Sequence, residues 1–178
     1  KAYHLIDRFS EDIDLAIDRK FLGFDGDLSA TQIKKLRKAS GTFIITDFFN
    51  ELKIQLKKLG ILDEEYELVT NNEIDDTSDP HTIELQYQSI VEQGDYLPQR
   101  VLIEIGSRSL MEPAESRPIE SIIGGVFPEQ KFAIKPFDVS VVIPTRTFLE
   151  KIFLLHEEFL KPKDKIRHLR MTRHLYDL

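Results

Sequence analysis

Alternating apolar and acidic residues indicate a strand near the start of the chain. Ile13 and Leu15 alternate with Asp12 and Asp14, which is the period of two that is typical of a half-buried strand, predicted here at about residues 12–18. Side chains two positions apart point to the same face, so the two aspartates project together. Neighbouring carboxylates repel each other, and a hard divalent cation with oxygen ligands relieves that repulsion. The alternative is a solvated polar face on an edge strand.

The rest of the chain divides into a helical stretch, a series of strands and a second helical stretch. Residues 1–7 are expected to end a helix, and glycines at 23–27 indicate a turn. Helices are then predicted from Ser29 to Lys38 and from Thr42 to Leu59, the latter ended by Gly60. The predicted strands are 66–69, 83–90, 100–105, 119–123 and 137–143. Helical spacing returns at 145–160 and 164–178.

This order of elements predicts an α+β fold, with helices packed on a mixed β-sheet core and a helical C-terminal region after it. The boundary is expected near Pro144, where the period of the apolar residues changes from that of strands to that of a helix. We therefore divide the chain into a core at 1–143 and the start of a helical region at 144–178. Because the chain begins at Lys1 without a methionine and stops within a predicted helix, we expect it to be a fragment.

Composition narrows the class of protein. Hydrophobic residues make up 41% and charged residues 31% of the chain, as in a soluble globular protein. The chain has no apolar run that is long enough to span a bilayer, so we expect no membrane association. It has no cysteine, which excludes a disulfide framework, a thiolate metal site and a cysteine nucleophile. A cytoplasmic location is the default expectation.

Charge is unevenly distributed along the chain. Residues 1–143 contain 16 Lys and Arg against 26 Asp and Glu, whereas residues 144–178 contain 8 against 5. Affinity for a polyanion should therefore be concentrated in the C-terminal part.

Glu104 is a lone charge in the apolar run 101–105. A glutamate among buried strand residues costs free energy unless it is paired or bound to a metal ion, which makes it a candidate third carboxylate. The alternative is an edge-strand glutamate that faces water. Arg146 and Lys151 lie at the start of the predicted helix 145–160, where the helix dipole and cationic side chains suit a polyphosphate.

Three segments together are similar to one protein family: "KAYHLIDRFSEDIDLAI", "PTRTFLEKIFLLHE" and "RHLRMTRHLYDL". In this order and spacing they resemble the AbiEii/AbiGii family of nucleotidyltransferase-like toxins, which belong to bacterial toxin–antitoxin and phage abortive-infection systems. The resemblance implies a nucleotidyltransferase-superfamily sheet. Members of this family usually carry a glycine-rich motif just upstream, of which Lys1 looks like the last residue.

The resemblance implies that the chain transfers a nucleoside monophosphate from an NTP to an acceptor hydroxyl, with RNA, in particular a tRNA 3′ end, as the acceptor and a cognate antitoxin as a possible partner. Asp12, Asp14 and Glu104 would be catalytic and hold Mg²⁺ or Mn²⁺. The nucleotide-binding residues would be Lys1, Ser10, Arg146, Lys151, Arg170 and Arg173.

Purely structural roles for the cationic residues remain open as alternatives. Arg146 and Glu150 form an i, i+4 pair, whereas Lys151 points elsewhere and is expected to be free for the triphosphate. Arg170 and Asp177 share a face of the last predicted helix, which could be a surface helix with salt bridges. Two other functions are kept as alternatives: a nucleotidyltransferase that acts on a small molecule such as an antibiotic, and a non-catalytic nucleotide-binding module.

Overall fold

The computed structural model describes residues 2–6, 12–70, 74–90, 98–107, 113–167 and 171–178. The chain forms two compact units. The first unit is Phe9–Met111, and the second combines Lys1–Arg8 with Glu112–Leu178.

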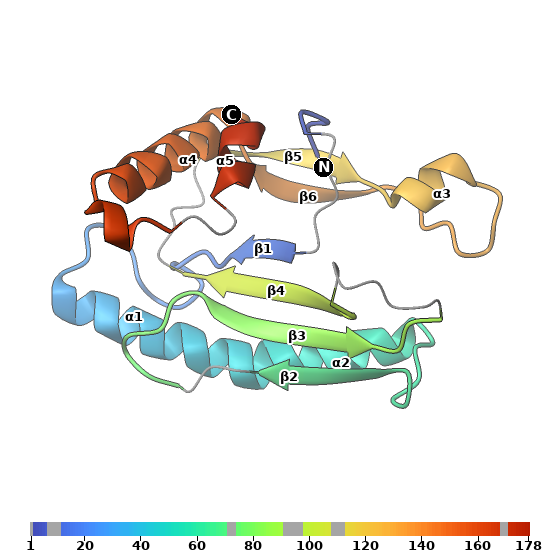
Figure 1. Cartoon of the computed structure of the whole chain (residues 1–178). Helices are drawn as coiled ribbons and strands as arrows, with labels where there is room; N and C mark the ends of the chain where they lie inside the picture. The colour runs from blue at the N-terminus through green and yellow to red at the C-terminus, as the bar shows by residue number, and fades with distance from the viewer. Residues whose placement is uncertain (1, 7–11, 71–73, 91–97, 108–112, 168–170) are drawn as a thin grey trace. The chain divides into compact units, whose positions relative to one another are not determined.

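The first unit is built on a four-stranded sheet with the strand order β1-β4-β3-β2 (Figure 1). Strand β1 runs parallel to β4, and the other two neighbouring pairs are antiparallel, so the sheet is mixed. Its strands are β1 (Asp12–Ala16), β2 (Tyr66–Thr70), β3 (His81–Tyr87) and β4 (Arg100–Gly106).

One continuous helical run covers one face of this sheet. It consists of α1 (Ala30–Phe43), the π-helical stretch η1 (Ile44–Phe48) and α2 (Phe49–Lys58). Ser29 caps its N-terminus as predicted, in a capping box with Gln32. Gly60, with φ of 84°, follows its last residues. The prediction of two separate helices was wrong, because the expected gap at residues 39–41 lies inside α1, and η1 continues α1 into α2 without a break.

The core of the first unit lies between the helical run and the sheet. Ile44 packs there against Ile83, Ile103 and Ile105, all of which are buried. Ile83 of β3 and Ile103 and Ile105 of β4 point to the helices, so the residues next to them in each strand point to the opposite, polar face of the sheet. That face carries the acidic residues.

The second unit consists of a two-stranded sheet and several helices. Strands β5 (Ala114–Ile119) and β6 (Phe137–Val142) pair in antiparallel fashion. The helical elements are α3 (Ile122–Val126), α4 (Pro144–Phe159), the 3₁₀ turn η2 (Lys163–Lys165) and α5 (Thr172–Asp177). The predicted strand 119–123 was wrong beyond its first residue: β5 ends at Ile119, and Ser121 caps α3 instead.

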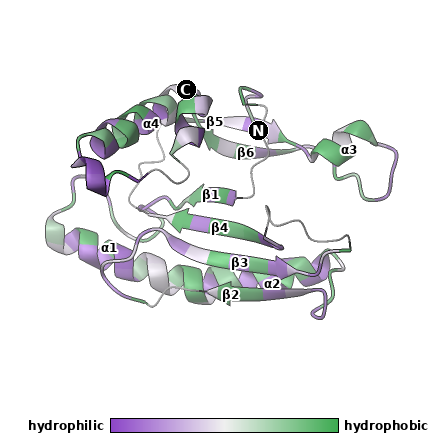
Figure 2. Cartoon of the chain, viewed as in Figure 1, coloured by the Kyte–Doolittle hydropathy of each residue, from purple (hydrophilic) through white to green (hydrophobic). Residues whose placement is uncertain are grey.

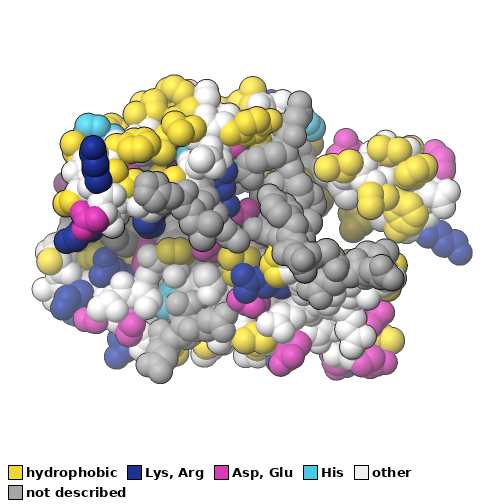
Figure 3. Space-filling model, viewed as in Figure 1, with side chains coloured by type: hydrophobic (Ala, Val, Ile, Leu, Met, Phe, Trp, Pro, Cys, Tyr) yellow, Lys and Arg dark blue, Asp and Glu magenta, His cyan; other side chains and the backbone are white. Residues whose placement is uncertain are grey.

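Helix α3 exposes apolar side chains. It is hydrophobic along its length in Figure 2, and in Figure 3 hydrophobic side chains gather over it. Ile122 is 82% exposed and Phe127 is 53% exposed.

Mixed helices and strands with a mixed sheet confirm the predicted α+β class, and the helical C-terminal region is also present. The helix expected at residues 1–7 is not found where that segment is described, since residues 2–6 form a turn and irregular structure. The domain boundary predicted near Pro144 does not coincide with the division into compact units and stays a prediction. No helix in the described part of the chain is long and apolar enough to cross a membrane.

Candidate active site

Three predicted acidic residues lie on the polar face of the first unit's sheet. The parallel pairing of β1 with β4 sets Asp14 beside Glu104, and Asp12 beside Leu102. Paired residues on neighbouring strands, and residues two apart on one strand, point to the same side, so Asp12, Asp14 and Glu104 share a face. Asp12 and Glu104 are half-buried, and Asp14 is exposed. The strand pairing thus makes neighbours of carboxylates that lie far apart in the sequence.

The hydrophobic core determines which way Glu104 points. Its neighbours Ile103 and Ile105 belong to the buried cluster under the helices, so Glu104 must project from the other face. Strand β4 has a neighbour on both sides, β1 and β3. The alternative that Glu104 is an edge-strand glutamate is therefore wrong. For Asp12 and Asp14 that alternative stays open, because β1 ends the strand order.

These carboxylates suit a hard divalent cation in their chemistry. Mg²⁺ and Mn²⁺ prefer oxygen ligands, and Asp12, Asp14 and Glu104 supply them from two adjacent strands. Among the residues that the structure describes, no three His, Asp or Glu side chains are gathered closely enough to hold a metal ion. A shared cation therefore requires these side chains to turn toward one another from their neighbouring backbone positions.

A fourth carboxylate on the same face was missed by the sequence analysis. Glu84 of β3 pairs in register with Leu102 of β4 and is only 8% exposed. It accepts a hydrogen bond from the guanidinium of Arg100, and another from Nε2 of Gln86 at 3.2 Å. The signal was available, because Glu84, like Glu104, is a lone charge with an apolar residue on each side of it.

Two predicted nucleotide-binding residues lie in α4, in the second unit. Nε of Arg146 donates to Glu150 Oε1 at 2.9 Å, which confirms the predicted i, i+4 pair. Nζ of Lys151 donates to Asp177 Oδ2 of α5 at 2.8 Å. The expectation that Lys151 is free was therefore wrong, and its role toward a triphosphate stays a prediction.

The short helix α5 supplies the partner of Lys151. The side chain of Asp177 is fully buried and that of Lys151 is 20% exposed, so the ion pair joins α4 to α5 within the unit. Arg173, also in α5, keeps its Nε buried without a hydrogen-bond acceptor among the described residues. Asp177 was not among the predicted site residues, because spacing alone did not show which cation it would face. Lys1, Ser10 and Arg170 lie outside the described residues.

A second buried carboxylate in this unit binds two cationic side chains. Glu158, 2% exposed, accepts hydrogen bonds from the backbone N–H and the guanidinium of Arg167 and from Nζ of Lys161. We call these three residues the Glu158 clasp. The hydrogen bonds from Arg167, followed by that from Lys161, lower the pKa of Glu158 from its ordinary 4.5 to about 2. The clasp ties the chain beyond η2 back to α4.

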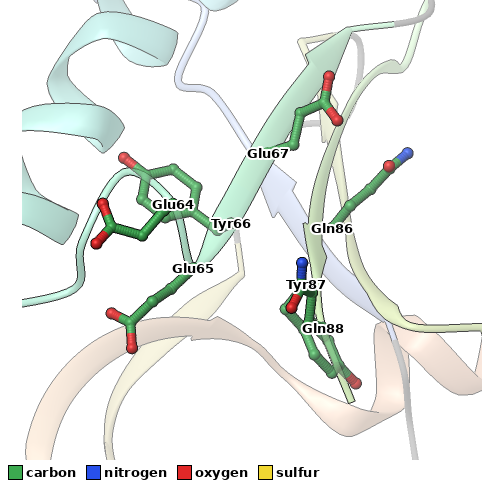
Figure 4. A pocket seen from close by; sticks show the side chains of 7 residues that line it. All are labelled: Glu64, Glu65, Tyr66, Glu67, Gln86, Tyr87 and Gln88. Carbon is green, nitrogen blue, oxygen red and sulfur yellow. The ribbon is translucent and has the colours of Figure 1, made fainter.

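A shallow hollow of about 330 Å³ lies beside the start of β2 and the end of β3 (Figure 4). Glu64, Glu65 and Glu67 line it, together with Tyr66 and residues 86–88 of β3 and its continuation. None of the seven lining residues is a lysine or arginine, so the hollow does not suit a triphosphate.

The comparisons with known proteins give one match. The model of the family described as "Nucleotidyl transferase AbiEii toxin, Type IV TA system" matches residues 1–178, the whole of the chain. No curated protein and no solved structure matches.

Proposed function

We propose that this chain, which belongs to the AbiEii family of nucleotidyl transferase toxins of type IV toxin–antitoxin systems, transfers a nucleoside monophosphate from an NTP to a hydroxyl of RNA. Membership of this family also implies a cognate antitoxin. The observation that carries the proposal is the register of β1 with β4, which sets Asp14 beside Glu104 on the polar face of the sheet.

The carboxylates of Asp12, Asp14 and Glu104 would hold Mg²⁺ or Mn²⁺. When bound, such an ion neutralises charge on the triphosphate and polarises the phosphoryl group under attack. One of the three carboxylates would also accept the proton of the acceptor hydroxyl, for which a general base within hydrogen-bond reach is needed. The core isoleucines on either side of Glu104 keep its backbone fixed for this role.

In the second unit, Lys151 is the proposed triphosphate ligand, and Arg146 with Glu150 holds the start of α4 in place. Lys151 donates to Asp177, so a phosphate oxygen would either share the ammonium group with that carboxylate or replace it. An ammonium group has three donors, which allows the first arrangement. Arg173 is a further proposed phosphate ligand, and its buried Nε has no acceptor among the described residues.

The proposal is tested by incubating the purified protein with each labelled NTP, Mg²⁺ and total RNA. We expect label in RNA of tRNA size and none after addition of a chelator. Glu104→Gln, which keeps the size of the side chain and removes its charge, should reduce incorporation at least about a hundredfold if the carboxylate contributes to metal binding. Labelling of small hydroxylated compounds but not of RNA would favour a small-molecule nucleotidyltransferase. NTP binding without any labelled product would favour a non-catalytic module.

A further inference from the structure

Arg100 stands out on the polar face of the first unit's sheet. It is the only lysine or arginine in the four strands as the structure describes them. Residues 59–99, immediately before it, contain 11 Asp and Glu and no Lys or Arg. Its register partner is Gln86, and in β4 it lies four residues before Glu104, so all three side chains are on one face.

The side chain of Arg100 is held in position from one side. Glu84, whose side chain is 10% exposed, accepts from Nη1 of Arg100, whose own side chain is 37% exposed. A guanidinium has five N–H donors. Within the described part of the chain, the side chain of Arg100 donates to Glu84. Most of its donors thus remain for another acceptor on the exposed side.

Stability alone is a weak reason for this pair. A partly buried ion pair seldom stabilises a fold more than apolar side chains of similar volume would, because the charges lose their hydration. A planar guanidinium fixed by a buried carboxylate is, however, pre-organised to bind a second anion, such as a phosphate, through two parallel N–H···O hydrogen bonds. An arginine presented in this way on a face of carboxylates gives a polyanion a defined point of attachment.

We propose that Arg100 binds a phosphodiester group of the RNA acceptor, on the 5′ side of the nucleotide whose hydroxyl reacts at Asp12, Asp14 and Glu104. This inference rests on the proposed function, because it takes those carboxylates as the reaction centre. It defines the acceptor as a strand of several nucleotides and argues against a small molecule.

The spacing along β4 indicates how long the acceptor must be. Four residues of a strand span about 13 Å, which separates the backbone positions of Arg100 and Glu104. Stacked nucleotides rise about 3.4 Å each, so the gap corresponds to about four nucleotides, and to fewer in an extended strand. Leu102, half-buried and apolar, lies between the two charged residues on the same face and suits contact with a ribose or base.

The test compares Glu84→Gln with the double variant Glu84→Gln/Arg100→Gln. These two proteins differ in the guanidinium, and neither leaves a buried carboxylate without its cation, so both should fold. Binding of a labelled single-stranded oligoribonucleotide of about ten nucleotides is measured by fluorescence anisotropy, without NTP or divalent ions, from about 50 to 200 mM salt. Arg117→Gln is the matched control, since Arg117 also pairs with a glutamate within a strand, at 2.8 Å.

We expect the double variant to bind RNA about tenfold more weakly than Glu84→Gln. The logarithm of the association constant should also fall less steeply with the logarithm of the salt concentration, by about 0.7 in slope, which is the value for one phosphate contact on a single strand. Arg117→Gln should leave the slope unchanged. Arg100→Lys, which keeps a cation beside Glu84, should retain the slope and bind more weakly, because a point charge replaces a planar fork.

Equal slopes for the single and the double variant, an equal loss for Arg117→Gln, or no RNA binding by the wild type would each overturn the inference. Its failure is separable from that of the proposed function, because binding is measured without turnover. If labelled NTP is transferred to RNA while Arg100 has no effect, the inference alone is wrong. If Arg100 governs RNA binding while no transfer occurs, the proposed activity alone is wrong.

Discussion

The two units of this protein use their carboxylates in different ways. Phe9–Met111 contains 11 Lys and Arg against 20 Asp and Glu, while the rest of the chain contains 13 against 11. In the second unit, buried Glu158 and Asp177 each bind a cationic side chain from another turn or helix. In the first unit, buried Glu84 is paired in the same way with Arg100. Strand register also sets Asp14 beside Glu104 there, at positions where the neighbouring charge has the same sign.

This contrast separates carboxylates that support the fold from those that suit chemistry. Where a buried ion pair joins two elements, losing either partner destabilises the fold, because it leaves a buried charge without compensation. Carboxylates placed side by side repel each other, so neutralising one should not harm the fold. Variants in the two units should therefore differ in whether they change activity, stability or both.

The largest effect is expected at Asp14. Asp14→Asn should reduce Mg²⁺-dependent transfer by about 10²–10³-fold, because a ligand of the cation is lost, while stability stays the same or rises slightly as repulsion decreases. Asp18→Asn makes the same chemical change just after β1, at a residue whose carboxylate accepts from the backbone N–H of Lys20. It should leave turnover near that of the wild type. A folded Asp14→Asn protein with full activity would contradict the assignment.

Lys151 should affect both activity and stability. Lys151→Ala is expected to lower kcat/KM by about 10²–10³-fold if the ammonium group stabilises negative charge on the triphosphate. It should also reduce the free energy of unfolding by about 2–4 kcal/mol, because the buried Asp177 loses its cation. Denaturant unfolding measures the second effect.

The double variant Lys151→Ala/Asp177→Asn separates these two roles. Removing the buried charge should restore much of the stability but not the turnover. Lys151→Arg should recover activity in part, since it retains the charge with a different shape. Recovery of full activity in the double variant would show that Lys151 serves only the packing of α4 with α5.

Gly41→Ala tests the contact between the helical run and the sheet. Alanine in place of glycine usually stabilises a helix by about 0.5–1 kcal/mol. Here an added Cβ would lie 2.8 Å from two ring atoms of His81, whose side chain is fully buried. We expect a loss of about 1–3 kcal/mol instead, from overpacking. A more stable Gly41→Ala protein in denaturant unfolding would show that the ring has room to move.

The last prediction concerns acid stability. The pKa of Glu158 is lowered from 4.5 to about 2 in the folded protein, so its contribution to stability is present above pH 4.5 and is lost as the pH falls toward 2. Asp75 of the first unit has a pKa of about 2 as well, because the backbone N–H groups of Ser78 and Thr77 donate to it. The free energy of unfolding of Glu158→Gln should fall less than that of the wild type between about pH 5 and 2, as measured by circular dichroism. Asp75→Asn provides the comparison for the first unit.

Local patterns were sufficient where one short segment decides the structure. Alternation of apolar and acidic residues predicted β1, the Ser29–Gln32 pair predicted the start of α1, and Pro144 predicted the start of α4. Glu104 could be singled out because a charge within an apolar strand is costly. These are properties of consecutive residues, which the sequence displays directly.

Two failures of the sequence analysis have different causes, one in a contact between distant segments and one in a local helix cap. Gly41 was expected between two helices but lies inside α1, and the ring of His81 packs against it there. Ser121, of a residue type that favours helix N-caps, accepts a hydrogen bond from the backbone N–H of Gly124, caps α3 and ends the predicted strand. In both places tertiary packing or a single side-chain hydrogen bond outweighed a weak local preference.

The sequence by itself determined that Asp12 and Asp14 share a face and that Arg146 pairs with Glu150, because each pair lies within one turn or one pleat of the backbone. Only the tertiary structure decided that Asp14 lies beside Glu104, since parallel strands far apart in the chain can pair in many registers. It also decided that Lys151 faces Asp177. Such pairings depend on how whole elements bury their apolar faces, and no spacing along the chain encodes that directly.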